Sequence, residues 1–451
     1  MRRSIVFLNV AAAVVLAGTA RANFVLTGTE HLNVNTSHTT GVLYDSSTAD
    51  VTGGYVSYLY ANDTSSVNVS GGSVGYLRAV NDSSVDVSSG TIFNYLHAYD
   101  NSSVNVSGGT ISGYLRAHND SSVDVSGGSA KFLTADSTSS VNFSGGRINY
   151  ELKAFDTSSV NVSGGSVNYL YAYNTSSVHV SGGTISNNLY AYNDSSVHVS
   201  GSSISPYLYA YDTSSVDVSG GSISNSLYAY NDSSVHVSGG SVNWLDARDT
   251  SNVALHGYDF QATRGLTLNG EEVLGTGLLT GKWFDGTSWA VTIDGNYPTA
   301  TIRAAVLAPS VASFAGAPTL VHDIDFGTVN PGDSVPGEPF AIWNLADPKW
   351  SMNLDLLSIV GSGDTGPLTA NLSPFTDLAA GQSHSFTAWI DTSVPGDFAA
   401  SYALNLSDRL GTDQTLTLNL RGSVVPEPST LVLLATGALG LTVAWWRGRR
   451  R

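Results

Sequence analysis

The sequence predicts an all-β protein: a β-solenoid (β-helix) of about 11–12 coils, then a cap, an immunoglobulin-like β-sandwich and a C-terminal transmembrane helix. Three observations predict this order. A leucine returns every 18 or 19 residues from Leu59 to Leu245. Between successive leucines, apolar and polar residues alternate, which is typical of strands with one buried face. After the repeats, β patterning continues with a different spacing, and an apolar run closes the chain.

Composition limits the possible partners. The chain has 451 residues, of which only 12% are charged, and its formal net charge is -17. Phosphate binding needs clustered Lys and Arg, so we expect no nucleic-acid partner. The sequence has no cysteine, which excludes disulfides and thiolate metal sites.

The N-terminus reads as a secretory signal peptide. Arg2 and Arg3 precede a long apolar run, and small residues at Ala20 and Ala22 fit a cleavage site. We therefore expect residues 1–22 to direct export and to be removed from the mature chain.

Residues 23–253 form the predicted solenoid. The recurring leucines are Leu59, Leu77, Leu96, Leu115, Leu133, Leu152, Leu170, Leu189, Leu208, Leu227 and Leu245. An alanine follows each leucine by two residues, and later apolar positions keep the same parity. A unit this short cannot bury its own apolar face, so the units must stack into columns. The spacing varies only between the Ile/Val column and the next leucine, which predicts a turn that tolerates one extra residue.

Two polar features of the repeat predict corners. A Gly-Gly pair closes most coils, for example Gly220-Gly221, and indicates a position that needs positive φ. An Asp or Asn stands four residues after nearly every leucine, for example Asp63 and Asn81. Stacked carboxylates could hold Ca²⁺, but the column mixes Asn with Asp freely, which favours Asx turns.

The outward positions beside the leucines are the candidate binding surface. We consider possible glycan contacts at Tyr171, Tyr190, Tyr209, Tyr211, Tyr228, Arg78 and Arg116. Tyrosines can provide a stacking platform for sugar rings, and arginines can bind an anionic glycan. The plainer explanations are ladder packing for the tyrosines and a solvated mixed surface for the arginines.

One outward column reads His179, His198, Asp217 and His236 in four consecutive coils. Imidazoles at the coil spacing could share a transition metal. Earlier coils carry Asn or Asp in this column, so polarity alone explains it. We expect neither a metal nor a cofactor.

Two further segments follow the repeats. Residues 254–313 lose the period but keep β patterning, and we expect them to form the solenoid cap and linker. Residues 314–424 contain about seven short strands, as in an immunoglobulin-like sandwich. They resemble the choice-of-anchor-D and ASPM-SPD2-Hydin modules, whose "DFG.V" strand and late "PG.F" turn match Asp325–Val329 and Pro395–Phe398. That resemblance implies a presenting or adhesive module and supplies no catalytic residue.

The last segment, residues 425–451, has three parts in order. Pro426, Glu427 and Pro428 precede about 16 apolar residues, and an arginine cluster follows. This arrangement resembles the PEP-CTERM sorting signal. The resemblance implies processing by an exosortase-type enzyme, with the helix holding the chain in the inner membrane beforehand. The alternative is an ordinary C-terminal anchor.

Together these features predict an exported surface or extracellular-matrix structural protein that displays a repetitive face and is associated with exopolysaccharide or biofilm. We expect it not to be an enzyme, because the coils lack cleft-building loops and the chain lacks the common catalytic motifs. One alternative is a carbohydrate-binding adhesin that uses the tyrosine-rich face. The other is a polysaccharide-cleaving β-helix enzyme. The expected localisation is the inner membrane first, then the cell surface or the extracellular space.

Overall fold

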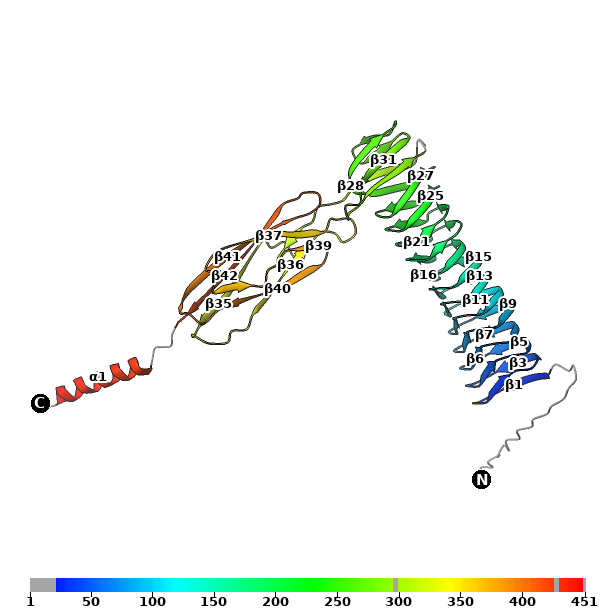
Figure 1. The fold of residues 1–451 in the computed structure, drawn as a ribbon, viewed down its shortest axis with the longest axis horizontal. Coiled ribbons are helices and arrows are strands. Elements are labelled where there is room, and N and C mark those ends of the chain that lie inside the picture. The colour runs from blue at the N-terminus through cyan, green and yellow to red at the C-terminus, as the bar shows by residue number, and fades with distance from the viewer. Residues whose placement is uncertain (1–21, 295–298, 426–429, 449–451) are drawn as a thin grey trace, which may run out of the picture. The chain divides into compact units, whose positions relative to one another are not determined.

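The computed structural model describes residues 22–294, 299–425 and 430–448, which form two compact units (Figure 1). Of these residues, the first unit comprises 22–253, Gly275–Gly277, 291–294 and 299–302, and the second comprises Ala254–Leu274, Leu278–Ala290, 303–425 and 430–448. The predicted signal peptide with Ala20 lies outside the described residues, and Ala22 begins the first strand. The Pro426, Glu427 and Pro428 motif also lies outside the described residues.

The first unit is a β-solenoid of about 12 coils. Each coil contributes one longer stretch to a sheet that we call the long sheet. Its strands are β1 (Ala22–Leu26), β3 (His38–Leu43), β5 (Tyr55–Ala61), β7 (Ser73–Ala79), β9 (Thr91–Ala98), β11 (Thr110–Ala117), β13 (Ser129–Ala135), β15 (Arg147–Ala154), β17 (Ser166–Ala172), β19 (Thr184–Ile185), β20 (Leu189–Ala191), β22 (Ser203–Ile204), β23 (Tyr207–Ala210), β25 (Ser222–Ala229) and β27 (Ser241–Ala247).

Each coil also contributes a four-residue strand to a second sheet, the short sheet. Its strands are β2 (His31–Val34), β4 (Thr48–Val51), β6 (Ser66–Val69), β8 (Ser84–Val87), β10 (Ser103–Val106), β12 (Ser122–Val125), β14 (Ser140–Phe143), β16 (Ser159–Val162), β18 (Ser177–Val180), β21 (Ser196–Val199), β24 (Ser215–Val218) and β26 (Ser234–Val237).

The pairing register confirms that residues 18 or 19 apart lie in columns. Leu115 pairs with Leu96 on one side and with Leu133 on the other, in parallel strands. Where 18-residue and 19-residue coils meet, the register shifts between the Ile/Val column and the leucine, as between Ile111 and Tyr114. The extra residue therefore enters at the segment that the sequence predicted.

The bore of the solenoid is filled by the inward columns. The leucines, the alanines two residues later, the paired valines and the Ile/Val column are almost all buried. Phe143 replaces a valine and is fully buried. Its ring fits because Gly165 in the next coil has no Cβ, which would clash with that ring. Apolar burial repeated along the stack is the main source of stability.

The two corners have separate physical causes. At the first corner, the Asx residue adopts a left-handed conformation, with φ of 57° at Asp63 and 61° at Asn81. Asp and Asn tolerate this region better than other non-glycine residues. The strict alternation of the sequence therefore breaks at this position, and Asp63 is exposed.

At the second corner, the two glycines have different roles. Gly109 needs its positive φ of 75°, whereas a Cβ on Gly108 would clash with the carbonyl oxygen of Ser88 in the preceding coil. The predicted glycine corner is confirmed, and close coil-to-coil approach explains why two glycines are used.

The long-sheet strand of the last coil, β27, pairs with a strand that follows the repeats in the chain, β32. Trp244 and Leu245 of β27 pair in parallel with Thr292 and Ile293 of β32 (Ser288–Ile293). The other strands in this region are β28 (Asn252–Thr263), β29 (Thr267–Asn269), β30 (Glu272–Leu274), β31 (Gly277–Lys282) and β33 (Thr301–Val306). In the second unit, Trp283 and Trp289 are buried and stack on each other, with ring centroids 4.6 Å apart.

A two-sheet β-sandwich follows. One sheet has the order β34 (Ala312–Ser313), β36 (Glu338–Asn344), β40 (Ser383–Ile390) and β38 (Leu368–Ala370). The other has the order β35 (Val321–Val329), β42 (Gln414–Val424), β41 (Gly396–Ser407), β37 (Leu354–Gly363) and β39 (Phe375–Leu378). The core between the sheets includes Ile342, Leu404 and Leu418. Nine strands are present where the sequence suggested about seven, because short β34 and β38 have little alternation to detect.

The C-terminal segment contains one helix, α1 (Thr430–Gly448). Among the described residues, no helix has the length and the apolar character that crossing a membrane requires. The expected helix is therefore present, while its expected role as a transmembrane anchor is not confirmed.

Candidate functional site

The most regular surface of the solenoid is an array of eight tyrosines on the long sheet. Tyr171, Tyr190, Tyr209 and Tyr228 pair in register as one column. The neighbouring column, two residues further along each coil, consists of Tyr173, Tyr192, Tyr211 and Tyr230. We call these eight residues the tyrosine array. From Tyr171 to Tyr230, neither column contains a charged side chain.

The rings of the array stack nearly face to face. Tyr190 and Tyr209 have centroids 5.0 Å apart with an interplanar angle of 6°. Across the columns, Tyr209 and Tyr211 have centroids 5.9 Å apart with an angle of 10°. Stacking of this kind stabilises the ladder, as the packing explanation predicts.

Cations cover two ends of the array. The Lys153 ammonium lies 5.4 Å from the ring centroid of Tyr171, and the Arg248 guanidinium lies 5.5 Å from that of Tyr230. Ring faces inside each column are covered by neighbouring rings. The array therefore offers ring edges and hydroxyl groups to a ligand, and stacking of a sugar ring on an aromatic face has little room.

Two hydroxyl groups of the array, those of Tyr171 and Tyr209, stay protonated well above neutral pH. Burial, followed by the neighbouring Glu151 and tyrosines, raises the pKa of Tyr171 to about 12. Burial and the neighbouring tyrosines raise the pKa of Tyr209 to about 12 as well. The array is thus a neutral surface of hydrogen-bond donors and acceptors on a strongly acidic chain.

Arg78 and Arg116 lie in the same column as Tyr171, several coils earlier. Arg116 donates from Nε to the Asp136 carboxylate at 2.8 Å, and its Nη2 makes a second, shorter bond to that carboxylate. His118 also pairs with Asp136, which is buried. Arg78 instead lies over the ring of Tyr99, 4.4 Å from its centroid. Much of the positive charge is therefore engaged within the face.

Two further groups on this face, His97 and Lys153, add little free positive charge. Burial and the nearby Arg116, His118 and Arg78 lower the pKa of His97 to about 4, so this imidazole is neutral at pH 7. Lys153 forms an ion pair with Glu151 at 2.7 Å. An anion that binds at Arg116 would have to compete with Asp136 for the guanidinium.

The Asx column forms a hydrogen-bonded ladder. Asn119 donates to Asp100 at 2.9 Å, Asn174 donates to Asp156 at 2.8 Å, and Asn231 donates to Asp212 at 3.1 Å. In these pairs an Asn stands beside an Asp, where a second carboxylate would repel the first at the coil spacing of about 4.8 Å. The column does not alternate strictly, since Asp45 and Asp63 occupy consecutive coils. The hydrogen bonds between Asn and Asp account for these pairs without a bound cation.

In the histidine column, the rings of His179 and His198 lie 5.0 Å apart, centroid to centroid. Throughout the described part of the chain, no three His, Cys, Asp or Glu side chains are grouped so that they could hold a metal ion.

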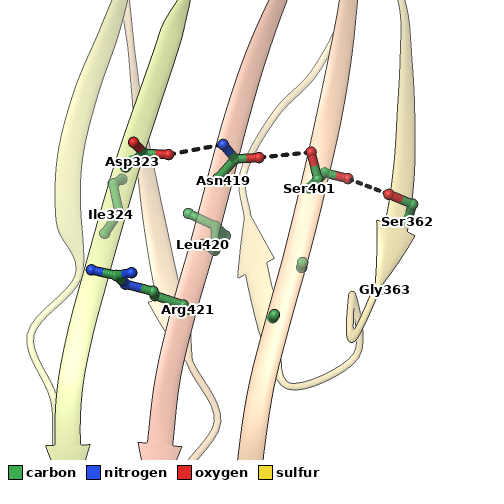
Figure 2. A pocket seen from close by; sticks show the side chains of 10 residues that line it. Asp323, Ile324, Ser362, Gly363, Ser401, Asn419, Leu420 and Arg421 are labelled. Atoms are coloured by element: carbon green, nitrogen blue, oxygen red, sulfur yellow. Dashed lines mark hydrogen bonds between the residues drawn. The ribbon is translucent and has the colours of Figure 1, made fainter.

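The sandwich contains a separate hollow of about 450 Å³ on its five-stranded sheet (Figure 2). A polar row crosses four strands in register. Asn419 donates to Asp323 at 2.8 Å, and the hydroxyl of Ser401 donates to Asn419 at 2.9 Å. The hydroxyl of Ser362 donates to the backbone oxygen of Ser401 at 3.3 Å. No pattern in the sequence indicates this row, because the row depends on pairing between distant strands.

The structure brings Tyr171, Tyr190, Tyr209 and Tyr228 into one column and places Tyr211 beside it. Sequence reasoning missed the role of Asp136 as the acid that binds Arg116. The available signal was its position three residues after Leu133, in the coil that follows Arg116.

Comparison with known proteins adds one finding about sequence. Residues 424–451 match the profile described as the PEP-CTERM protein-sorting motif. The chain carries this sorting motif at its C-terminus. The motif indicates an exported protein that an exosortase sorts. No curated protein matches the chain significantly.

Several solved structures are similar to parts of the chain. The ASH / PapD-like domain 7 of human CEP192 is 12% identical, with a TM-score of 0.20, covering 26% of this chain and 86% of that one. The Vibrio cholerae VesB protease is 14% identical, with a TM-score of 0.18, covering 26% and 32%. A Porphyromonas gingivalis W83 protein of unknown function is 15% identical, with a TM-score of 0.19, covering 35% and 68%. At these TM-scores the likenesses support no conclusion about function.

Proposed function

We propose that this protein is a non-enzymatic structural or display protein of the cell surface or extracellular matrix, processed by an exosortase-type enzyme and associated with exopolysaccharide or biofilm. The observation that carries the proposal is the sorting motif at residues 424–451. In this proposal the signal peptide directs export, and the C-terminal segment with α1 holds the chain in the inner membrane until it is processed. The solenoid then displays its repeated faces outside the cell.

The display role is supported by how the solenoid uses its polar groups. Asp136, the acid that Arg116 contacts, is buried and bound to both Arg116 and His118. These groups stabilise the stack, whereas a hydrolytic site needs a carboxylate that reaches the substrate. A release assay for reducing ends on bacterial polysaccharides tests the enzymatic alternative, and sustained release would overturn the display role.

The sandwich is proposed to be a choice-of-anchor-D-like spacer. The "DFGTV" segment lies on β35, and the "PGDF" segment leads into β41 (Figure 1). Asp325 accepts a bond from the amide of Gly327 and pairs with Arg421 at 3.0 Å. Asp325 of the first motif segment thus ties β35 to β42.

The sorting step can be tested in a bacterium that has an exosortase. Replacing Pro426, Glu427 and Pro428 by alanine should leave the chain in the membrane fraction and remove it from the cell surface. Replacing Ser423 by alanine, just outside the matched residues, is the control. Equal surface amounts for both variants, or no change on deleting the exosortase, would count against processing.

A second candidate function, a carbohydrate-binding adhesin, is favoured by the tyrosine array. Its hydroxyl groups repeat in two columns, with ring centroids 4.9 Å apart between Tyr171 and Tyr190. Replacing Tyr190 and Tyr209 by phenylalanine keeps the stacking and removes two hydroxyls. Binding to exopolysaccharide should fall for this variant, while Tyr150→Phe, at an exposed site elsewhere, should leave it unchanged. Equal binding by both variants would exclude contact through these hydroxyls.

A further inference from the structure

The first coil of the solenoid has two strand edges without a neighbouring strand. β1 pairs with β3, and β2 pairs with β4. The residues that the structure describes place no strand on the other side of either. Strands further along the stack, such as β3, pair on both sides. Unpaired parallel edges attract additional strands, and natural proteins usually cover them.

The side chains at this end already close the bore. The half-buried Phe24 ring takes the space that a Cβ on Gly41 would fill. It packs edge-on against His38, with ring centroids 5.2 Å apart. Leu26 and Val34 are buried behind it. The apolar interior is thus covered in part by the Phe24 ring, and the main-chain groups of the edge strands also remain to be satisfied.

The hydrogen bonds show which residues face the open edge. Tyr44 donates from its amide to the Leu26 oxygen, and Thr52 donates to the Val34 oxygen, both toward the next coil. In a parallel strand, alternate residues direct their main-chain groups to opposite edges. Val25 and Asn33 therefore present their amides and carbonyls to the open side, and the Val25 side chain is 59% exposed.

We propose that this end of the solenoid is an interface with a second copy of the chain, joined end to end. The two open edges belong to different sheets at a fixed separation, so a single peptide strand would satisfy only one of them. The first coil of another copy has the same two edges at the same separation. A two-fold axis running from the long sheet to the short sheet places β1 against β1 and β2 against β2, both antiparallel.

This inference goes beyond the proposed function and rests on only one part of it, the removal of residues 1–22.

The test uses the exported chain after residues 1–22 have been removed, with its N-terminus determined by mass spectrometry to be Asn23. Size-exclusion chromatography with light scattering should give twice the mass of one chain. Amide hydrogen exchange at Val25 and Asn33 should slow as the protein concentration rises.

The matched variants are Val25→Pro and Val25→Thr. Proline removes the amide that faces the open edge and leaves the bonds to β3, so the mass should fall to that of one chain. Threonine keeps the amide, and the mass should stay doubled. Asn33→Pro repeats the test on the other sheet, and far-UV circular dichroism confirms that each variant is folded.

A single-chain mass for the wild type with Asn23 at its N-terminus would overturn the proposal. A doubled mass that persists in both folded proline variants would also overturn it, because the interface would then lie elsewhere.

Discussion

The Arg116 side chain donates a hydrogen bond from Nε to the carboxylate of Asp136 in the next coil, at 2.8 Å. Asp136 is only 5% exposed and also pairs with His118. This acid therefore compensates the Arg116 guanidinium and binds the His118 imidazole, whose own pKa is lowered, chiefly by burial. Its burial makes it the most consequential ionisable group on this part of the long sheet.

Replacing Asp136 by asparagine should destabilise the solenoid by about 2 kcal/mol, because Arg116 and His118 lose their shared partner. Urea unfolding followed by circular dichroism measures the change. The control is Asp86→Asn. Asp86 is exposed, and the new asparagine still has an oxygen that accepts the hydrogen bond from Asn105, so the free energy of unfolding should change by less than about 0.5 kcal/mol. Similar values for the two variants would show that the Arg116 pair contributes little.

Replacing Asn231 by aspartate should weaken the Asx ladder. The side-chain amide of Asn231 donates to the Asp212 carboxylate at 3.1 Å, and its main-chain amide donates to the Asp249 carboxylate at 3.2 Å. The variant would stack three carboxylates, and we expect a loss of about 0.5–1 kcal/mol that diminishes in high salt. Thermal melts at low and high salt measure it. Asn231→Ser is the control, since Ser137 occupies the equivalent corner with φ of 57°. A stability gain with added Ca²⁺ would instead indicate a cation site.

Replacing Gly164 by alanine should strain the glycine corner. The added Cβ would clash with the carbonyl oxygen of Ser144 in the preceding coil. Since backbone must shift to relieve this clash, we expect a loss of about 1–3 kcal/mol. Gly316→Ala, where no atom lies within 4 Å of the added Cβ, should be close to neutral. Equal melting temperatures for the two variants would show that the coils can separate without cost.

Alkaline pH should destabilise the tyrosine array. The folded-state pKa of Tyr171 and Tyr209 is raised to about 12, whereas tyrosine in the unfolded chain titrates near 10. Between these values the unfolded chain loses protons that the folded chain keeps, so stability falls as pH rises from about 10 to 12. Absorbance at the phenolate band, with Tyr209→Phe for comparison, follows this titration. Complete ionisation near pH 10 in the folded protein would contradict the burial of these hydroxyls.

Mild acid should destabilise the coils around His97. Its folded-state pKa is lowered to about 4, chiefly by burial, while histidine in the unfolded chain titrates near 6.5. The unfolded chain therefore binds a proton that the folded chain does not, and stability falls as pH drops from about 6.5 to 4. Urea midpoints across this interval should shift less in His97→Gln than in the wild type. An identical shift in both proteins would assign the effect to other groups.

The sequence by itself determined the solenoid, because successive coils repeat the same inward apolar positions and most of them repeat the same glycine corner. The repeat period alone places Leu96, Leu115 and Leu133 in one column, since a short unit buries its apolar face only by stacking. The face that carries Tyr190 and Tyr209 followed from the same period.

Only the tertiary structure decided how side chains on that face interact. Whether Arg116 is available to a ligand depends on Asp136, which lies 20 residues later and reaches Arg116 only after the coil has closed. The ring stacking of the array and the row from Asp323 to Ser362 likewise depend on rotamers and on pairing between distant strands. Periodicity specifies which residues share a column, while contacts between columns depend on three-dimensional distances that a one-dimensional pattern does not contain.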